Sequence, residues 1–222
     1  GITNKILSRF VDVVAVGYNE AAKSFDKAKQ VVYTGNPVRP DVLVDSRVEG
    51  RKHFGLSDDI FTVLIAGGSR GARTINNAMI DVHKHFQGKD GIKLIHITGN
   101  GEYTSVLEKL GINDGSGLGE SSLILPYLHD MPKALAATDL AVFRSGAIGL
   151  AELAVRGIPS VLVPYPYAAE DHQTYNARIF VQEGAAHMIV DKVLTSHDLI
   201  GEIEMFMANR ELLAQIDRKS VV

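Results

Sequence analysis

The sequence predicts an α/β protein built around a parallel β-sheet. From Ile60 onward, short apolar runs rich in β-branched residues alternate with longer segments of helical period, which is typical of parallel strands joined by crossover helices. The chain has 222 residues, 45% of them hydrophobic, which is enough for one large core. Six strands within about 130 residues is the size of a nucleotide-binding domain. The expected strands are Phe61–Ala66, Leu94–Thr98, Ser122–Leu125, Leu140–Phe143, Ser160–Val163 and His187–Val190.

Helices are expected between these strands. Asp130 is placed to cap a helix that has Pro132 in its first turn. A second helix begins near Gly146 and ends where Gly157 is followed by Pro159. The predicted fold class is therefore a Rossmann-like α/β sheet of about six strands with helices on both faces.

A smaller α/β unit is expected ahead of this sheet. Its strands are predicted at Val11–Val16 and Gln30–Tyr33, with a short helix at Glu20–Phe25 between them. Pro37 and Pro40 then favour a turn or linker. The expected parts are residues 1–36 as the end of an amino-terminal domain, 37–58 as an interdomain linker and entry, and 59–222 as a ligand-binding domain.

Composition and charge restrict the possible functions. The formal net charge is −3, which argues against a dedicated nucleic-acid-binding module, and the lack of cysteine excludes disulfide and thiol chemistry. No apolar run approaches the ~18 residues of a membrane-spanning helix. The eight histidines show no metal-ligand spacing, so we expect no metal site. Because the sequence starts without methionine, we expect a fragment of a longer protein.

The first candidate site is a glycine-rich turn between a strand and a helix. Gly67, Gly68, Ser69 and Gly71 stand directly after the strand that ends at Ala66. Glycines let the backbone approach a ligand, and the N–H groups at the start of the helix suit an anion such as a diphosphate. A tight turn without a ligand is the alternative. A dinucleotide site fits less well, because the second strand has no acidic residue placed to take a ribose.

The second candidate site repeats this geometry after another strand. Arg144 supplies a cation, Ser145 and Gly146 form the turn, and Glu152 follows about two turns into the helix. A carboxylate that accepts hydrogen bonds from two vicinal hydroxyls is a common way to bind a ribose. The alternative for Glu152 is a solvated helix residue.

The third candidate site follows a proline-rich strand end. Gln173 and Asn176 are three residues apart, so they share one face of the expected helix, and amides suit the hydroxyls of a sugar. Each could instead be a helix cap or a surface residue, and His172 is as well explained by the surface as by ligand contact. All three candidate sites follow strands, so in a parallel sheet they gather at the carboxyl edge. Together they predict a site for a nucleotide that carries a hydroxylated group.

Four segments in this order match a known family. They are Gly67-Gly68-Ser69-Arg70-Gly71-Ala72-Arg73, Leu125-Pro126-Tyr127-Leu128-His129-Asp130-Met131, Arg144-Ser145-Gly146-Ala147 through Glu152, and His172-Gln173 with Asn176-Ala177. They resemble the carboxyl-terminal half of the MurG family of peptidoglycan N-acetylglucosaminyltransferases, which have the two-domain GT-B fold. Residues 34–39 resemble the segment between the two domains of that family.

The resemblance implies a set of residues that bind the donor UDP-N-acetylglucosamine. The backbone of Leu128 would meet the uracil, Glu152 the ribose hydroxyls and Gln173 the sugar hydroxyls. Arg39 would lie near the interdomain cleft, and Gly149 stands where many relatives carry a hydroxyl residue. The implied donor-binding residues are Arg39, Ser69, Leu128, Arg144, Ala147, Ile148, Gly149, Leu150, Glu152, Gln173 and Asn176, and the implied phosphate loops are Gly67, Gly68, Ser69 and Gly71 together with Ser145 and Gly146.

The function implied by the resemblance is transfer of N-acetylglucosamine from UDP-N-acetylglucosamine to lipid I, giving lipid II with inversion at the anomeric carbon. Neither a metal nor a cofactor is implied. The general base and the acceptor loop belong to the amino-terminal half, so the chain is expected to bind the donor without efficient turnover. The family works at the cytoplasmic face of the bacterial membrane as a peripheral protein. The alternatives are a UDP-glucose or UDP-galactose diacylglycerol glycosyltransferase and a non-catalytic nucleotide-sugar-binding module.

Overall fold

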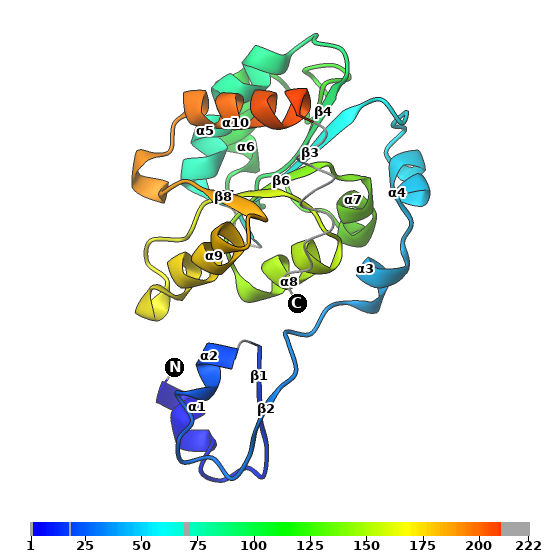
Figure 1. The fold of residues 1–222 in the computed structure, drawn as a ribbon. Coiled ribbons are helices and arrows are strands. Elements are labelled where there is room, and N and C mark those ends of the chain that lie inside the picture. The colour runs from blue at the N-terminus through cyan, green and yellow to red at the C-terminus, as the bar shows by residue number, and fades with distance from the viewer. Residues whose placement is uncertain (1, 18, 69–71, 210–222) are drawn as a thin grey trace.

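The centre of the protein is a six-stranded parallel sheet. The computed structural model describes residues 2–17, 19–68 and 72–209. The strand order is β5-β4-β3-β6-β7-β8, and every neighbouring pair is parallel (Figure 1). The strands are β3 (Phe61–Ala66), β4 (Ile92–Ile97), β5 (Ser122–Leu125), β6 (Leu140–Phe143), β7 (Ser160–Leu162) and β8 (Ala186–Met188). The predicted α/β class and its six strands are confirmed, with strand ends that differ from the prediction by one or two residues.

Helices cover both faces of this sheet. Figure 1 shows α5, α6 and α10 on one face and α7, α8 and α9 on the other. The helices are α5 (Arg73–Phe86), α6 (Tyr103–Leu110), α7 (Met131–Ala137), α8 (Ala147–Val155), α9 (His172–Gln182) and α10 (Ser196–Ala208), with 3-10 turns η1 (Ala169–Asp171) and η2 (Asp191–Val193). Helix α10 packs against α5, so the last described helix closes the first face.

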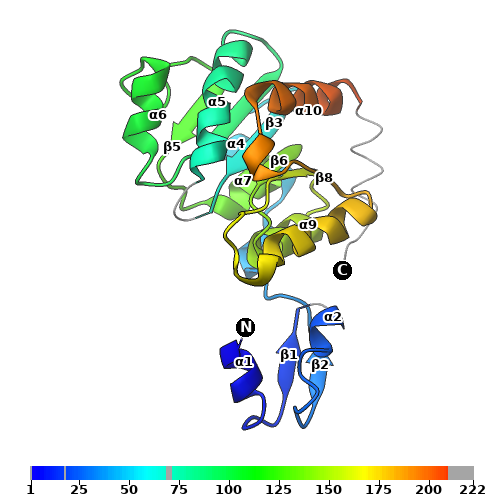
Figure 2. The ribbon, with the colours of Figure 1, turned by 90° about the vertical axis from the view of Figure 1, so that its left-hand side faces the viewer.

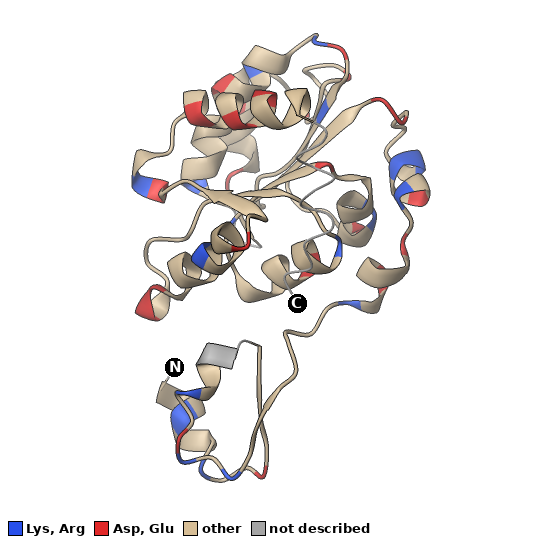
Figure 3. Ribbon diagram, in the orientation of Figure 1, with Lys and Arg blue, Asp and Glu red and all other residues tan. Residues whose placement is uncertain are grey.

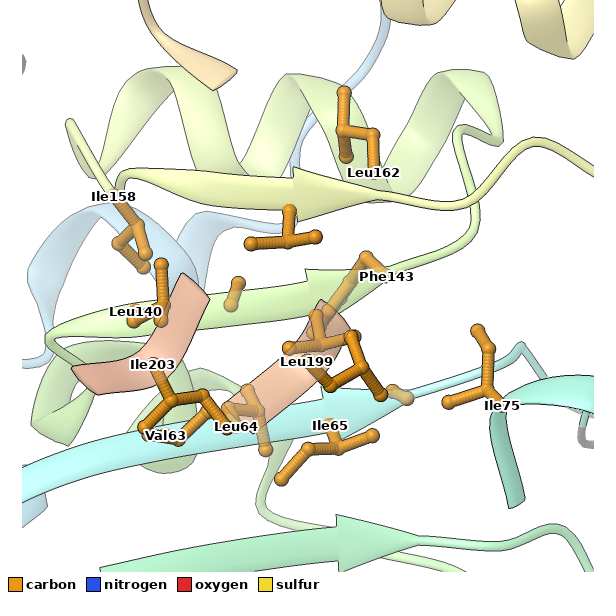
Figure 4. Packing of buried hydrophobic residues seen from close by; sticks show 14 of the residues in the cluster. Val63, Leu64, Ile65, Ile75, Leu140, Phe143, Ile158, Leu162, Leu199 and Ile203 are labelled. Atoms are coloured by element: carbon orange, nitrogen blue, oxygen red, sulfur yellow. The ribbon is translucent and has the colours of Figure 1, made fainter. Parts of the chain in front are cut away.

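Burial explains why the central strands form. All six residues of β3 are buried, as expected for a strand with helices on both faces. Figure 4 shows Leu64 and Ile65 of β3 with Leu199 and Ile203 of α10, all fully buried. This packing holds the strands in register, so that their carboxyl ends reach the same edge of the sheet.

The predicted helix boundaries in this domain are largely confirmed. Helix α7 begins at Met131 with Pro132 in its first turn, and α8 begins after Gly146 and ends before Gly157, which has a left-handed φ of 62°. The predicted capping by Asp130 is wrong, because its side chain makes no capping hydrogen bond. Its carboxylate instead lies 3.4 Å from Nε2 of His53.

The amino-terminal part carries a sheet of its own. Strands β1 (Val14–Val16) and β2 (Val31–Tyr33) pair in parallel, and Figure 2 shows them beside α1 (Ile2–Leu7) and α2 (Asn19–Ala22). The predicted helix to Phe25 is too long, because the N–H groups of Ser24 and Phe25 bond to carbonyls three residues earlier and form turns. Helices α3 (Pro40–Val44) and α4 (Arg47–His53) then lead into β3. The domain limits at residues 36 and 58 stay predictions.

None of the helices in the described ranges combines the length and the apolar character that crossing a membrane requires.

Candidate functional site

The carboxyl edge of the sheet opens into a cleft of about 870 Å³. Its walls include the segments that follow all six strands, among them Gly67, Leu128, Arg144 and Tyr165. Parallel strands bring their carboxyl ends together, so residues far apart in sequence meet here. The predicted convergence of the three candidate sites is thus seen in the structure.

The first wall is the turn into α5. Gly67 and Gly68 line the cleft, and Gly68 has a φ of +90°, a conformation that strongly favours glycine. Ala72 precedes α5 and offers no side-chain cap, so the N–H groups of the first turn are not used by a cap. Such a helix end attracts anions. The predicted loop residues Ser69 and Gly71 lie outside the described residues.

The second wall is the start of α8. Gly146 precedes this helix and provides no side-chain cap, so a second helix end points its N–H groups toward the cleft edge. Gly149 also lines the cleft, and a Cβ there would meet the ring of Phe143 at 3.6 Å, an ordinary contact. The other predicted residues of this turn lie elsewhere: Ile148 is 60% exposed and outside the cleft lining, Leu150 is fully buried in the core, and Ala147 is half-buried beside the lining.

Glu152 is buried and paired with Arg39. The Glu152 side chain is 6% exposed, and its two oxygens accept from Nε and Nη2 of Arg39 at 2.7 and 3.1 Å. The solvated-helix alternative for Glu152 is therefore wrong. The hydrogen bond to Glu152 raises the pKa of the Arg39 guanidinium. Each carboxylate oxygen keeps a second lone pair, so Glu152 can also accept from a vicinal diol in the cleft.

Arg144 is anchored and neutralised. It donates to the carbonyls of Val163 and Pro164 at 3.1 Å each and forms an ion pair with Asp191. The hydroxyl of Thr74, in the first turn of α5, donates to the other oxygen of Asp191 at 3.0 Å. Sequence reasoning predicted Arg144 as a fixed cation and missed its partner Asp191. A signal existed, because Asp191 directly follows the end of a predicted strand, as the other cleft residues do.

The two predicted site residues of α9, Gln173 and Asn176, differ in their surroundings. Gln173 lines the cleft, and its Oε1 accepts from the Tyr165 N–H at 3.0 Å, while its Nε2 has no acceptor among the described residues. Asn176 is buried and donates to the Ser145 carbonyl at 3.1 Å. The Ser145 hydroxyl donates to the Gln173 carbonyl at 2.8 Å, so it ties α9 to the turn before α8.

His172 lies at the exposed start of α9. Its Nδ1 bonds with the Ala169 carbonyl at 2.7 Å, and it is not among the cleft-lining residues. The residues just before it, Glu170 and Asp171, have φ of 55° and 50°. Two consecutive non-glycine residues in the left-handed region strain this loop, and such strain is often found beside binding sites.

Leu128 and Met131 form an apolar wall after β5. Both line the cleft and pack against the main core. An apolar wall beside a few polar groups is the usual composition of a small-molecule site. Within residues 2–17, 19–68 and 72–209, no three His, Cys, Asp or Glu side chains are arranged to hold a metal ion.

Comparison with known proteins identifies the domain. Residues 62–221 match the glycosyltransferase family 28 C-terminal domain. The chain belongs to glycosyltransferase family 28. The predicted resemblance and the predicted fold are both confirmed: this family 28 chain aligns over its full length with the crystal structure of Acinetobacter baumannii MurG at 28% identity and a TM-score of 0.71, covering 59% of that chain.

Curated relatives of this family 28 domain carry one name, UDP-N-acetylglucosamine–N-acetylmuramyl-(pentapeptide) pyrophosphoryl-undecaprenol N-acetylglucosamine transferase. The protein of Desulforamulus reducens is 41% identical over 99% of this chain and 59% of its own length. That of Desulfitobacterium hafniense is 44% identical over 97% of this chain and 58% of its own length. The family 28 chain thus spans less than two thirds of the relatives it matches.

Proposed function

We propose that this chain is the donor-binding domain of an N-acetylglucosaminyltransferase that converts lipid I to lipid II in peptidoglycan synthesis. The names of relatives at 41% and 44% identity support this activity. The observation that carries the proposal is the cleft itself, where two uncapped helix ends flank a buried carboxylate. That combination suits the diphosphate and the ribose of UDP-N-acetylglucosamine.

Each wall of the cleft has a proposed role. The first turns of α5 and α8 bind the diphosphate, with Gly67, Gly68 and Gly146 giving the backbone its close approach. Glu152 accepts from the two ribose hydroxyls. The backbone of Leu128 meets the uracil. Gln173 donates its free Nε2 hydrogens to a hydroxyl oxygen of the sugar.

The proposed chemistry is an inverting displacement at the anomeric carbon. The bond from that carbon to the diphosphate oxygen breaks, and a bond to the acceptor hydroxyl oxygen forms from the opposite face. Negative charge grows on the leaving UDP, and helix N-termini that already point at it stabilise that charge without reorganising. The acceptor proton passes to a base in the amino-terminal half of the longer protein, so this chain alone is proposed to bind the donor without efficient turnover.

The proposed site of action is the cytoplasmic face of the bacterial membrane, where lipid I is the acceptor and UDP-N-acetylglucosamine the donor. Peripheral membrane contact belongs to the longer protein in this proposal. The name of the curated relatives supports membrane contact, because undecaprenol is a membrane lipid.

Calorimetric titration tests the donor assignment. The chain is expected to bind UDP and UDP-N-acetylglucosamine at least about tenfold more tightly than ADP or NAD, because the uracil edge is read by the Leu128 backbone. Equal affinities for UDP and ADP would contradict the proposal. Titration with UDP-glucose and UDP-galactose then separates it from a diacylglycerol glycosyltransferase, which would prefer one of those sugars.

A further inference from the structure

One carboxylate lies where an anionic ligand would bind. Asp191 lines the cleft at the end formed by Gly67, Gly68 and the first turn of α5. Its side chain is 12% exposed, so water screens its charge only weakly. A fixed negative charge at this point opposes the binding of a diphosphate, which carries charge of the same sign.

The partners of Asp191 are the donors that a diphosphate would use. One oxygen of Asp191 pairs with Nη1 of Arg144, and the other accepts from the hydroxyl of Thr74 at 3.0 Å. Guanidinium and hydroxyl groups beside a helix N-terminus are the usual ligands of phosphate oxygens. Asp191 therefore accepts the Thr74 hydroxyl and faces the charge of Arg144, as a phosphate oxygen at this position would.

The ion pair of Arg39 and Glu152 shows that not every pair in the cleft has this property. There the carboxylate is the group proposed to meet the ligand, and its partner Arg39 is 47% exposed at the outer side. Glu152 can accept from a diol while it keeps Arg39, because each oxygen has a second lone pair. Thr74 differs, since the single hydroxyl hydrogen that it donates to Asp191 cannot also point at a phosphate. Arg144 faces Asp191 as a charge, because its Nη1 hydrogens already point at the carbonyls of Val163 and Pro164.

We propose that Asp191 is an internal competitor of the diphosphate. This inference rests on the proposed function, because it requires the diphosphate at this end of the cleft. UDP binding draws the Thr74 hydroxyl from Asp191 to a phosphate oxygen, and the diphosphate competes with Asp191 for the charge of Arg144. When the sugar has been transferred, Asp191 takes the hydroxyl back and favours release of UDP. Asp191 thereby sets the affinity of the site for the diphosphate and leaves the affinity for the nucleoside unchanged.

The test compares UDP with uridine on wild type and on Asp191→Asn. Removing the charge is expected to strengthen UDP binding about tenfold, by loss of Coulomb repulsion, and to change uridine binding less than about twofold. Glu204→Gln is the matched control, because it makes the same change in net charge on α10, where Glu204 pairs with His85 away from the cleft. That control is expected to leave both affinities unchanged.

The outcomes separate the two proposals. A wild-type chain that binds UDP no more tightly than uridine overturns the diphosphate site and with it this inference. If wild type prefers UDP, then an Asp191→Asn variant that binds UDP equally or more weakly overturns the inference alone. So does a gain that is the same for UDP and uridine.

A second measurement needs no variant. A crystal structure of the wild-type chain with UDP is expected to show the Thr74 hydroxyl on a phosphate oxygen. Bound UDP with the hydrogen bond from Thr74 to Asp191 intact would overturn the competition.

Discussion

Two buried arginines lie at opposite edges of the same sheet. Arg51 of α4 lies at the amino edge, where Lys and Arg are prominent in Figure 3, and Arg144 follows β6 at the carboxyl edge. Arg51 donates to the carbonyls of Ala137, Ser57 and Ile60 and lies 3.5 Å from Asp139. Arg144 has the same kinds of partner, two carbonyls and one aspartate.

The two arginines differ in whether they line the cleft. Arg51 is 2% exposed on α4, which packs against α7, whereas Arg144 lines the cleft. Burial lowers the pKa of Arg51, and the nearby carboxylates and carbonyls keep its charge compensated. Similar chemistry therefore serves stability at the amino edge and the proposed ligand binding at the carboxyl edge. The position along the strands, and not the residue type, decides the role.

Replacing Arg51 is expected to have the largest effect. Arg51→Met takes a donor from three carbonyls and one cation from Asp139, so the free energy of unfolding should fall by about 3–5 kcal/mol. Urea denaturation measures this loss. Lys52→Met, on the exposed side of the same helix, is the control and should change stability by less than about 0.5 kcal/mol. If Arg51→Met lowered the free energy of unfolding no more than Lys52→Met does, the contacts of Arg51 at the amino edge would not stabilise the fold.

The next largest effect on stability is expected from two buried histidines that contact each other, His83 and His96. When both rings are neutral, the hydroxyl of Ser122 donates to Nδ1 of His83, Nε2–H of His83 donates to Nδ1 of His96, and Nε2–H of His96 donates to the Asn76 side-chain oxygen, over 2.9, 3.1 and 3.0 Å. Every ring nitrogen of the neutral pair then has a partner. Desolvation lowers the pKa of His83 to about 4 and that of His96 well below its usual value.

The sign of the pH effect follows from these shifts. Below pH 6.5 the unfolded chain binds protons that native His83 and His96 do not, so stability is complete above pH 6.5 and falls toward pH 4. His83 alone accounts for a loss of about 3 kcal/mol by pH 4. Denaturation between pH 6.5 and 5 measures the slope largely above the carboxylate range. His85→Gln, on the exposed side of α5, should keep the slope, and a flat profile in wild type would refute the neutral pair.

A smaller change in free energy is expected for a substitution in the cleft at the carboxyl edge. Glu152→Ala removes the proposed ribose acceptor and should weaken UDP binding by about 1–3 kcal/mol. Calorimetry gives the affinity, and circular dichroism confirms the fold. Glu108→Ala, on the exposed surface of α6, is the control and should bind UDP as wild type does. An unchanged affinity in folded Glu152→Ala would remove the carboxylate from the site.

The smallest effect is expected at Gly149. Among the described residues an added Cβ meets only the ring of Phe143, at 3.6 Å, so Gly149→Ala fits and should stabilise α8 by about 0.5 kcal/mol through helix propensity. A small rise in the melting temperature is the expected result. Destabilisation would mean that this wall of the cleft is packed more tightly than the backbone indicates.

Much of the fold could be predicted because local patterns report it. The buried run of β3 and the Pro132 and Gly157 signals gave strand and helix positions within one or two residues. The convergence of glycine turns at the carboxyl edge followed from parallel strands alone. The helix predicted at Glu20–Phe25 extends three residues beyond the observed end of α2 at Ala22. The length of such a short helix depends on tertiary packing, which composition does not reveal.

The ion pairs of the cleft could not be predicted. Arg39 and Glu152 are 113 residues apart, and Thr74 and Asp191 are 117 residues apart. Such partners are set by tertiary structure, which one sequence does not report residue by residue. Sequence reasoning therefore identified Arg144 and Glu152 as cleft residues but left each without its partner.

Amide hydrogen exchange of the chain with and without UDP tests most directly whether the carboxyl edge, and not the amino edge, binds the nucleotide. Slower exchange is predicted for Thr74 and Ile75 in the first turn of α5, for the first turn of α8 and for Leu128, with no change at Thr62 or Leu56 near Arg51. Protection at Thr62 and Leu56, or none at either helix start, would contradict the assignment of the two edges.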